Sequence, residues 1–275
     1  MIPRSRTLGR MTVLTRTPAP VDPGLLSRAL EVAGRLANDA AEVIVATAGR
    51  APGSEAKADP FDWVTDTDRT LERHTRRVLA AEFPGIPVVG EEYGADATAA
   101  GSPFRWIVDP VDGTANYVAG FPWCAYSLGL VDGDGPVVGV VADPSRAQMY
   151  AAARGRGVRA NGVPVRAATG TTAVGALVCA ESPSPGFVER AAAHHTGVRV
   201  LGSTALAITQ VALGRAVGAV IDSYHEWDVA GALCLALEAG AVVVDRAGRP
   251  DPMPTGGVLV AVPAVVEQVY SWWAA

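Results

Sequence analysis

The segment Trp106–Asn116 constrains the fold of this 275-residue chain more than any other part of it. Its apolar residues predict a strand that ends at Asp109, where Pro110 would fix a turn. The turn would bring Asp109 and Asp112 side by side, with the carbonyl group of Val111 between them. Two carboxylates and a carbonyl are hard oxygen donors, which suit Mg²⁺ better than zinc. We therefore expect a magnesium site at the carboxyl end of this strand.

The residues directly after the aspartate pair point to an anion beside the metal. Gly113 and Thr114 would begin the next turn, where free backbone N–H groups can hold a phosphate. Two ordinary turns, Asp-Pro and Asp-Gly, would also explain the aspartates. The presence of Thr114 and Asn116 in the same short segment favours the functional interpretation.

Two further acidic regions lie far from this segment in the sequence. One comprises residues 62–68, which end in Asp68, together with Gly90-Glu91-Glu92. The other contains Asp228 at the expected start of an apolar helix. Taken alone, acids and threonines at a helix start are typical of helix caps, and paired glutamates are typical of solvated loops.

Electrostatic repulsion would be strong if the fold gathered these acids in one place. Two carboxylates about 4 Å apart repel each other by roughly 4 kcal/mol at an effective dielectric constant of about 20. A cluster of several such groups would be hard to ionise without cations, and its members would be Asp68, Glu91, Asp109, Asp112 and Asp228. Metal ions would then be close to obligatory.

The composition excludes several classes of protein. A net charge of −5 gives no basic surface field that would hold nucleic acid or an anionic membrane. The three cysteines stand far apart in apolar runs, so we expect a reducing cytoplasm rather than a disulfide framework or a cysteine zinc site. No run of about 18 uncharged apolar residues predicts a membrane helix. The first twenty residues hold four arginines and no acids, and we expect residues 1–22 to form a disordered tail.

Hydrophobic periodicity divides the rest of the chain into two expected parts. An α+β domain over 23–165 would carry most of the acidic residues, and an α/β domain over 166–275 would supply Asp228. Trp272 and Trp273 are expected to pack on the core or on a partner. Helices are predicted over 24–48, 69–83, 204–213 and 229–239, and strands over 86–89, 104–108, 126–131, 137–141, 148–152, 174–179, 217–221 and 241–244.

The order and the residues of the acidic segments resemble those of the inositol monophosphatase family of Mg²⁺-dependent, often lithium-sensitive phosphomonoesterases. The matching segments are Lys57 with residues 62–68, Gly90-Glu91-Glu92, residues 109–116 and residues 227–231. The resemblance extends from about Gly24 to the C-terminus. It implies a layered α/β/α/β/α sandwich, usually a homodimer, that hydrolyses a small phosphorylated substrate with two or three Mg²⁺ ions.

The resemblance also implies which residues hold the metal ions. Glu91, Asp109 and the carbonyl group of Val111 would hold the first ion. Asp109, Asp112 and Asp228 would hold the second ion. These ions would activate the water that attacks the phosphate and neutralise charge on the departing oxygen.

The remaining roles concern catalysis and the substrate. A weaker third ion would share Glu91, with Asp68 helping through water. Thr114, hydrogen-bonded to Asp68, would orient and help to deprotonate the attacking water, so the expected catalytic residues are Thr114, Asp68 and Glu91. Lys57 would lie at the rim of the metal site. The expected substrate contacts are Gly113, Thr114, Ser203, Thr204 and Asp228.

The resemblance defines the substrate less narrowly than it defines the chemistry. Many inositol-cleaving members carry an acid that holds sugar hydroxyls at the position of Ile221, and an aspartate is frequent at the position of Val217. Asp222 could substitute for the missing acid if the loop shifted. Unpaired hydroxyls would weaken binding by roughly a few kcal/mol.

Myo-inositol monophosphate is the first candidate substrate. Histidinol phosphate, fructose bisphosphate and adenosine bisphosphate are alternatives in the same superfamily, and a non-catalytic accessory protein is the alternative outside the enzymes.

Overall fold

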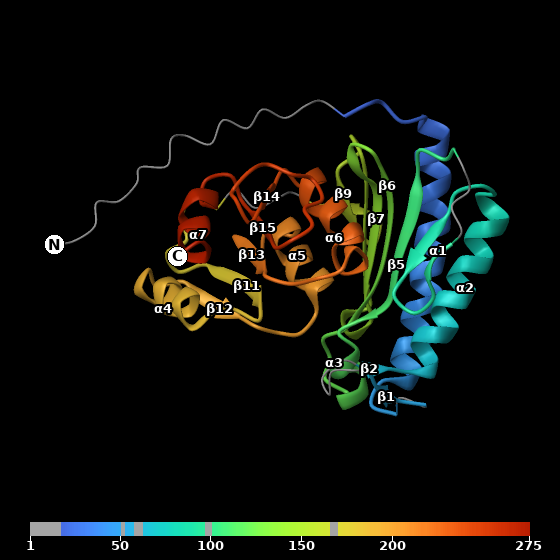
Figure 1. Cartoon of the computed structure of the whole chain (residues 1–275), viewed down its shortest axis with the longest axis horizontal. Helices are drawn as coiled ribbons and strands as arrows, with labels where there is room; N and C mark the ends of the chain where they lie inside the picture. Colours follow the sequence, from blue (N-terminus) through green and yellow to red (C-terminus); the bar gives the residue numbers. More distant parts are fainter. Residues whose placement is uncertain (1–17, 51–52, 58–62, 97–100, 166–169) are drawn as a thin grey trace.

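The computed structural model describes residues 18–50, 53–57, 63–96, 101–165 and 170–275. Most of the predicted tail over 1–22 therefore lies outside the described residues, as does residue 62 of the first acidic region. Five layers lie one after another across the molecule in Figure 1: a helix pair, a large sheet, a second helix pair, a smaller sheet and a third helix pair. The implied α/β/α/β/α sandwich is confirmed.

The outer layer beside the large sheet consists of α1 (Pro23–Thr47) and α2 (Asp66–Glu82). Asp22 caps α1 by accepting a hydrogen bond from the N–H of Leu25 at 2.9 Å, and Pro23 fits the first helical position. A buried stripe of mostly Ala, Val and Leu runs along α1 at helical spacing and packs against the middle of the sheet. The apolar stripe thus fixes one face of the sheet that carries the candidate site.

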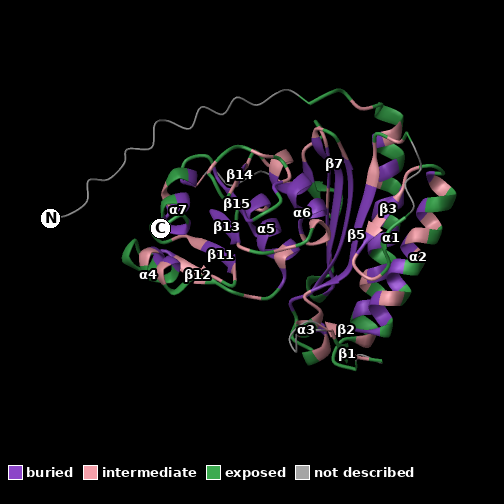
Figure 2. Cartoon of the chain, in the orientation of Figure 1, coloured by how far each residue is buried: buried purple, intermediate pink, exposed green. Residues whose placement is uncertain are grey.

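The large sheet has eight strands in the order β10-β9-β8-β7-β6-β5-β3-β4. Their bounds are β3 Val88–Gly90, β4 Gly94–Ala95, β5 Arg105–Asp112, β6 Ala125–Asp132, β7 Gly135–Asp143, β8 Gln148–Ala153, β9 Val158–Ala160 and β10 Val163–Pro164. Neighbouring strands are antiparallel except β3 and β5, which are parallel. Helices cover both faces of β6 and β7, so nearly every residue of these strands is buried, as Figure 2 shows for β7.

β5 departs from the prediction at the point where the candidate site begins. The sequence predicts a strand that stops before a turn at Pro110, whereas β5 continues through Pro110 to Asp112. Its pairing with β6 shifts register between Asp109 and Asp112, so an irregularity within the strand replaces the turn. Such a bulge accommodates proline because the ladder already lacks a hydrogen bond there. Both aspartates therefore remain at the buried carboxyl end of β5.

The central layer consists of α5 (Thr204–Ala212) and α6 (Glu226–Glu238), which lie between the two sheets. The smaller sheet is mixed, with the order β12-β11-β13-β15-β14. Its bounds are β11 Leu177–Glu181, β12 Gly197–Arg199, β13 Gly218–Ile221, β14 Val242–Asp245 and β15 Val258–Ala261. α4 (Pro185–Ala193) and α7 (Val266–Trp273) form the far layer. Shorter elements are β1 (Glu55–Ala56), β2 (Trp63–Val64), α3 (Thr114–Ala119) and a 3₁₀ turn over Pro144–Arg146.

Two helices begin three residues before their predicted starts, α2 at Asp66 instead of 69 and α6 at Glu226 instead of 229. The acidic residues expected just outside these helices therefore lie in their first turns. Periodicity misses such turns because polar capping residues carry no apolar signal. The periodicity predicts neither α4 nor α7, although the buried positions of Trp272 and Trp273 on α7 confirm that these side chains pack on the core.

The chain passes from the large sheet to the smaller sheet near the predicted domain boundary. Strands up to Pro164 belong to the large sheet, and strands from Leu177 onward belong to the smaller one. α6 nevertheless packs chiefly on the large sheet, although it belongs to the second half of the sequence. The division into two domains stays a prediction. Among the described residues, no helix has both the length and the apolar character that a membrane span requires.

Candidate functional site

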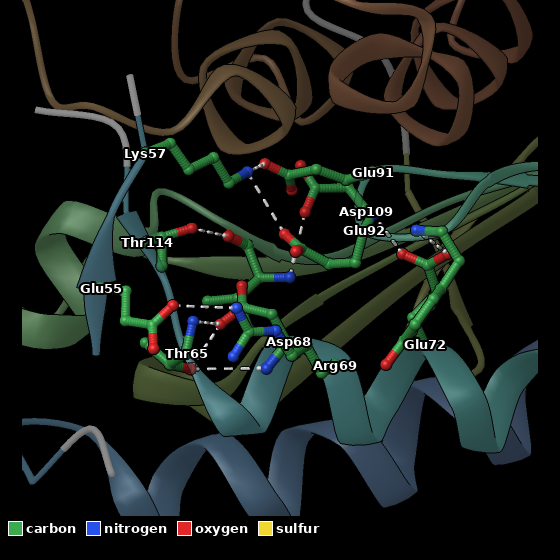
Figure 3. Close-up of polar contacts among 12 residues, drawn as sticks. Glu55, Lys57, Thr65, Asp68, Arg69, Glu72, Glu91, Glu92, Asp109 and Thr114 are labelled. Carbon is green, nitrogen blue, oxygen red and sulfur yellow. Dashed lines mark hydrogen bonds and ion pairs between the residues drawn. The ribbon is translucent and has the colours of Figure 1, made fainter. Parts of the chain in front are cut away.

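The candidate site lies where the carboxyl ends of β3 and β5 meet the first turns of two helices. β5 ends in Asp109 and Asp112, and β3, its parallel neighbour, ends just before Glu91. The first turn of α2 carries Asp68, and the first turn of α6 carries Asp228. Figure 3 shows Asp68, Glu91 and Asp109 in one neighbourhood. Four elements from both halves of the sequence thus converge.

Asp109 lies at the centre of this convergence. Its side chain is 2% exposed, and Oδ1 accepts a hydrogen bond from the N–H of Val111 at 3.0 Å. Burial raises its pKa well above the ordinary value of 3.8, because the charged form loses its hydration. The negative charges of the four other acids raise it further, and these are Glu91, Asp112, Asp228 and Asp68. The predicted carboxylates therefore act on one another electrostatically.

The carboxylates lie near one another but do not form a closed metal-binding site. Within the part of the chain that the structure describes, no three His, Cys, Asp or Glu side chains are arranged so that they alone could hold a metal ion. Backbone and side-chain donors satisfy part of each carboxylate instead. Asp228, for example, accepts a hydrogen bond from the N–H of His225 at 2.7 Å, which also caps α6.

Asp68 faces the site from the capping box of α2. Its Oδ2 accepts hydrogen bonds from the N–H of Thr65, at 3.0 Å, and from the Thr65 hydroxyl. Its Oδ1 is buried and has no hydrogen-bond partner. Burial raises the pKa of Asp68 from 3.8 to about 7, against the lowering effect of Thr65, and the charges of Glu91 and Glu92 raise it as well.

Asp112 joins the two halves of the molecule. Its carboxylate accepts hydrogen bonds from the Ser203 hydroxyl and from the N–H groups of Thr204 and Ala205, at 3.2 and 2.9 Å. These donors form the N-terminus of α5, whose dipole favours a negative charge. Burial nevertheless raises the pKa of Asp112 to about 8, and the charge of Asp228 adds to the rise. Ser203 and Thr204, the expected substrate contacts, thus adjoin a predicted metal ligand.

Thr114 occupies its expected place but has a different partner. Its hydroxyl donates a hydrogen bond to the carbonyl of Val111 at 2.9 Å, rather than to Asp68 as the resemblance implies. Gly113 precedes Thr114 with a φ of 86°, in the left-handed region, and a Cβ there would lie 2.6 Å from the Gly202 carbonyl oxygen.

Lys57 lies against the glutamates of the β3–β4 turn. Its Nζ is 2.6 Å from Glu91 Oε1 and 3.3 Å from Glu92 Oε1. Dashed lines mark these ion pairs in Figure 3. Burial raises the pKa of Glu92, and the lysine opposes that rise. An ammonium group thus supplies positive charge beside Glu91, and its place at the rim of a metal site stays a prediction.

Two glutamates that the sequence pattern did not single out also support the site. Glu72 is buried on α2 and accepts hydrogen bonds from the turn that carries Glu91. Glu181, at the end of β11, accepts a hydrogen bond from the N–H of Gly202 at 3.2 Å. The spacing of Glu72, four residues after Asp68, places both on one helix face and could have revealed it. Glu181 gives no such signal, because its position depends on how β11 pairs in the sheet.

Comparison with known proteins identifies the family. A family model described as the inositol monophosphatase family matches residues 25–271. This chain belongs to that family. The inositol-1-monophosphatase ImpA of Mycolicibacterium smegmatis is 31% identical over 261 residues, which cover 90% of this chain and 93% of that protein. Like its family, the chain is a phosphoric monoester hydrolase.

Two further relatives extend the comparison. A fructose-1,6-bisphosphatase/inositol-1-monophosphatase of Aquifex aeolicus is 34% identical over 190 residues, which cover 66% of this chain and 71% of that protein. The solved structure of an IMPase of Thermotoga maritima matches with a TM-score of 0.82 at 26% identity, covering 89% of this chain and 96% of the other. The inositol monophosphatase fold therefore spans nearly the whole described chain.

The substrate side of the site departs from the pattern that the resemblance implies. Ile221 and Val217 are buried in the apolar core, so neither position offers a polar group. Asp222 does not replace them, because its Oδ1 accepts hydrogen bonds from Arg246 at 2.6 Å and from Trp273 Nε1 at 2.8 Å. Glu181, at the end of β11, pairs in register with Ile221 on the neighbouring strand.

The donor chemistry of this family member fits magnesium. The candidate ligands are carboxylate and carbonyl oxygens, which hard divalent cations prefer. An ionised carboxylate oxygen that is buried without a partner, such as Asp68 Oδ1, is costly unless a cation or water reaches it. An open arrangement also suits Mg²⁺, which keeps several of its waters and takes only one or two carboxylates in many sites.

Proposed function

We propose that this member of the inositol monophosphatase family is a Mg²⁺-dependent phosphomonoesterase of a small phosphorylated polyol, with myo-inositol monophosphate as the first substrate to test. The observation that carries the proposal is Asp109, whose pKa is raised by burial and by the charges of four other carboxylates. Such crowding has little value in a binding module, whereas it is what a site for divalent cations requires.

The residues that would hold the ions are those that the resemblance implies. Glu91, Asp109 and the Val111 carbonyl would hold one ion, and Asp109, Asp112 and Asp228 would hold another. Magnesium, when bound, supplies positive charge for the phosphoryl oxygens and acidifies water. A third ion at Glu91 belongs to the same proposal, as does the inhibition by lithium that the resemblance implies.

The chain itself would orient the water and the phosphate. The Thr114 hydroxyl already donates a hydrogen bond beside the candidate ligands, at the Val111 carbonyl. Asp68 Oδ1 is the buried acceptor that would receive a proton or a hydrogen bond from the attacking water. The backbone N–H groups of Gly113 and Thr114 would hold phosphate oxygens, since the left-handed Gly113 opens the turn at α3. Neutral donors and fixed positions of this kind stabilise the charge that develops during transfer.

The identity of the polyol rests on fewer contacts. The names of the Mycolicibacterium and Aquifex relatives point to inositol monophosphate and to fructose bisphosphate. Ser203 and Thr204 adjoin Asp112 at the end of β5. The half-buried Glu181 accepts a hydrogen bond from the neighbouring Gly202, so these three are the polar groups that we expect to contact the polyol. Because Ile221 offers no carboxylate, we expect polyol binding that depends on these residues.

A phosphate-release screen tests the proposal. The purified full chain would be assayed with Mg²⁺ against inositol monophosphate, histidinol phosphate, fructose bisphosphate and adenosine bisphosphate. We expect hydrolysis of a polyol phosphate that disappears after exhaustive chelation and in Asp109→Asn. Asp222→Asn is a matched control, because Asp222 is bound by Arg246 and Trp273 outside the site. Absence of hydrolysis with every substrate would favour the accessory protein instead, and full activity of Asp109→Asn would contradict the assigned site.

Two wider expectations accompany this function. The homodimer that the resemblance implies and the cytoplasmic location inferred from the cysteines stay predictions. Size-exclusion chromatography with light scattering distinguishes a dimer from a monomer of 28.3 kDa.

A further inference from the structure

Glu72 stands one helical turn after Asp68 on α2, on the face that packs against the large sheet. It is a charged residue with 0% exposure in the described structure. Burial of a carboxylate is unfavourable unless it is paired and hydrogen-bonded, so its partners reveal what it holds.

The Glu72 carboxylate holds the turn that comes after β3. Its two oxygens accept hydrogen bonds from the N–H of Glu92 at 2.7 Å and from the N–H of Tyr93 at 3.2 Å, as Figure 3 shows for the neighbourhood. Hydrogen bonds to an ionised acceptor are about twice as strong as neutral ones. Glu91, a candidate metal ligand, is the residue directly before these two donors.

Arg76 completes the clamp on this turn. It pairs with Glu72 through Nε at 2.9 Å, which balances the buried charge. The same guanidinium donates hydrogen bonds to the carbonyl of Val88 at 3.4 Å and to the carbonyl of Gly94. These carbonyls belong to β3 and β4, on either side of the turn. The pair therefore fixes both strands that flank Glu91.

Gly90 makes this close approach possible. A Cβ at residue 90 would overlap the carboxylate of Glu72, closer than any van der Waals contact allows. Only glycine therefore lets the carboxylate reach the N–H groups beyond it. Packing against α2, as much as the strand itself, therefore explains why residue 90 of Gly90-Glu91-Glu92 is a glycine.

We infer that Glu72 is a positioning residue that sets the affinity of the site for divalent cations through the main chain of Glu91. The inference rests on the proposed function. The hydrogen-bond partners of Glu72 are Arg76 and the N–H groups of Glu92 and Tyr93. It would act by holding the turn so that the Glu91 carboxylate faces Asp109. Partners that orient a metal ligand typically change metal affinity by about 10–100-fold when they are removed.

The test compares two glutamates of the same helix. Glu72→Gln keeps the side-chain shape but removes the charge that holds the turn. Glu82→Gln is the matched control, because Glu82 is also on α2 and also pairs with arginines, Arg28 and Arg35, but at the far end of the helix. Mg²⁺ affinity would be measured on the full chain by titration calorimetry, alongside thermal denaturation and steady-state kinetics.

We expect Glu72→Gln to weaken Mg²⁺ binding by about tenfold or more, with the substrate KM at saturating Mg²⁺ unchanged. Glu82→Gln should bind Mg²⁺ like the wild type. Gly90→Ala should weaken Mg²⁺ binding in the same way, and the double variant should show less than the sum of the two effects, since both disturb one contact.

Unchanged Mg²⁺ affinity in a folded Glu72→Gln protein, or equal weakening in Glu82→Gln, would overturn the inference. If Glu72→Gln does not fold, Glu72→Asp carries the same test, because it keeps the charge but withdraws it from the turn. A wild-type chain that neither binds Mg²⁺ nor hydrolyses a phosphomonoester would instead defeat the proposed function. The two failures are therefore distinguishable in the wild-type measurements alone.

Discussion

The stability of the metal-free protein should depend on pH because the site contains buried acids. The pKa of Asp68 is raised from 3.8 to about 7, mainly by burial. Between these values the unfolded chain has lost this proton while the folded protein keeps it, so stability falls as the pH rises. A shift of this size corresponds to about 4 kcal/mol for one isolated group. Asp112, with a pKa raised to about 8, acts in the same direction, although neighbouring groups titrate together and their contributions do not add.

The assay is urea denaturation in EDTA at several pH values. We expect the free energy of unfolding to fall by about 3 kcal/mol between roughly pH 4.5 and pH 8, because part of the full effect is already lost below pH 4.5. Saturating Mg²⁺ should remove most of that fall, because cations favour the ionised carboxylates. Asp68→Asn should make the fall in the metal-free profile smaller, whereas Asp222→Asn, outside the site, should leave the fall in place. Metal-free stability that is constant or rises over this range would refute the reasoning.

Three further variants probe individual parts of the site. Gly113→Ala should lower the melting temperature, because a left-handed alanine costs about 1–2 kcal/mol and its Cβ would press on the Gly202 carbonyl; a melting temperature equal to the wild type would contradict this packing. Thr114→Val, which removes the hydroxyl at the Val111 carbonyl, should lower kcat by about 10²-fold or more with little loss of stability; an unchanged kcat would exclude Thr114 from catalysis. Glu181→Gln should raise the polyol KM by about tenfold, and a KM equal to the wild type would remove Glu181 from the substrate side.

The sequence is informative where function requires particular residue types at short spacing. The apolar run before Asp109 predicts a strand, and the structure places Asp109 at the buried end of β5. Helical periodicity predicts a first helix over 24–48, close to α1 at Pro23–Thr47. Both features depend on local patterns of side chains, which a single sequence contains in full.

Features that depend on pairing between distant segments could not be predicted. The bulge in β5 arises from its register with β6, and Pro110 alone suggests a turn instead. The hydrogen bonds from Ser203 and Thr204 to Asp112 join residues about ninety positions apart. Hydrophobic periodicity does not predict these two hydrogen bonds, because they depend on the packing of α5 between the sheets.

The partner of Thr114 shows a second limit. The resemblance implies a hydrogen bond to Asp68, but the Thr65 capping box engages one Asp68 oxygen, and Thr114 donates to the Val111 carbonyl. A motif match transfers the residue and its place in the fold. It does not specify the hydrogen-bond acceptor, which for the Thr114 hydroxyl is the Val111 carbonyl.

The central claim is that divalent cations bind among the carboxylates of β5, α2 and α6. Anomalous diffraction from crystals of the full chain soaked in Mn²⁺, a scattering substitute for Mg²⁺, would locate the ions directly. We expect a peak within about 2.0–2.6 Å of an oxygen of Asp109, shared with Asp112 or Asp228. A map with no peak at Asp109, in crystals of protein that hydrolyses its substrate with Mn²⁺, would contradict it.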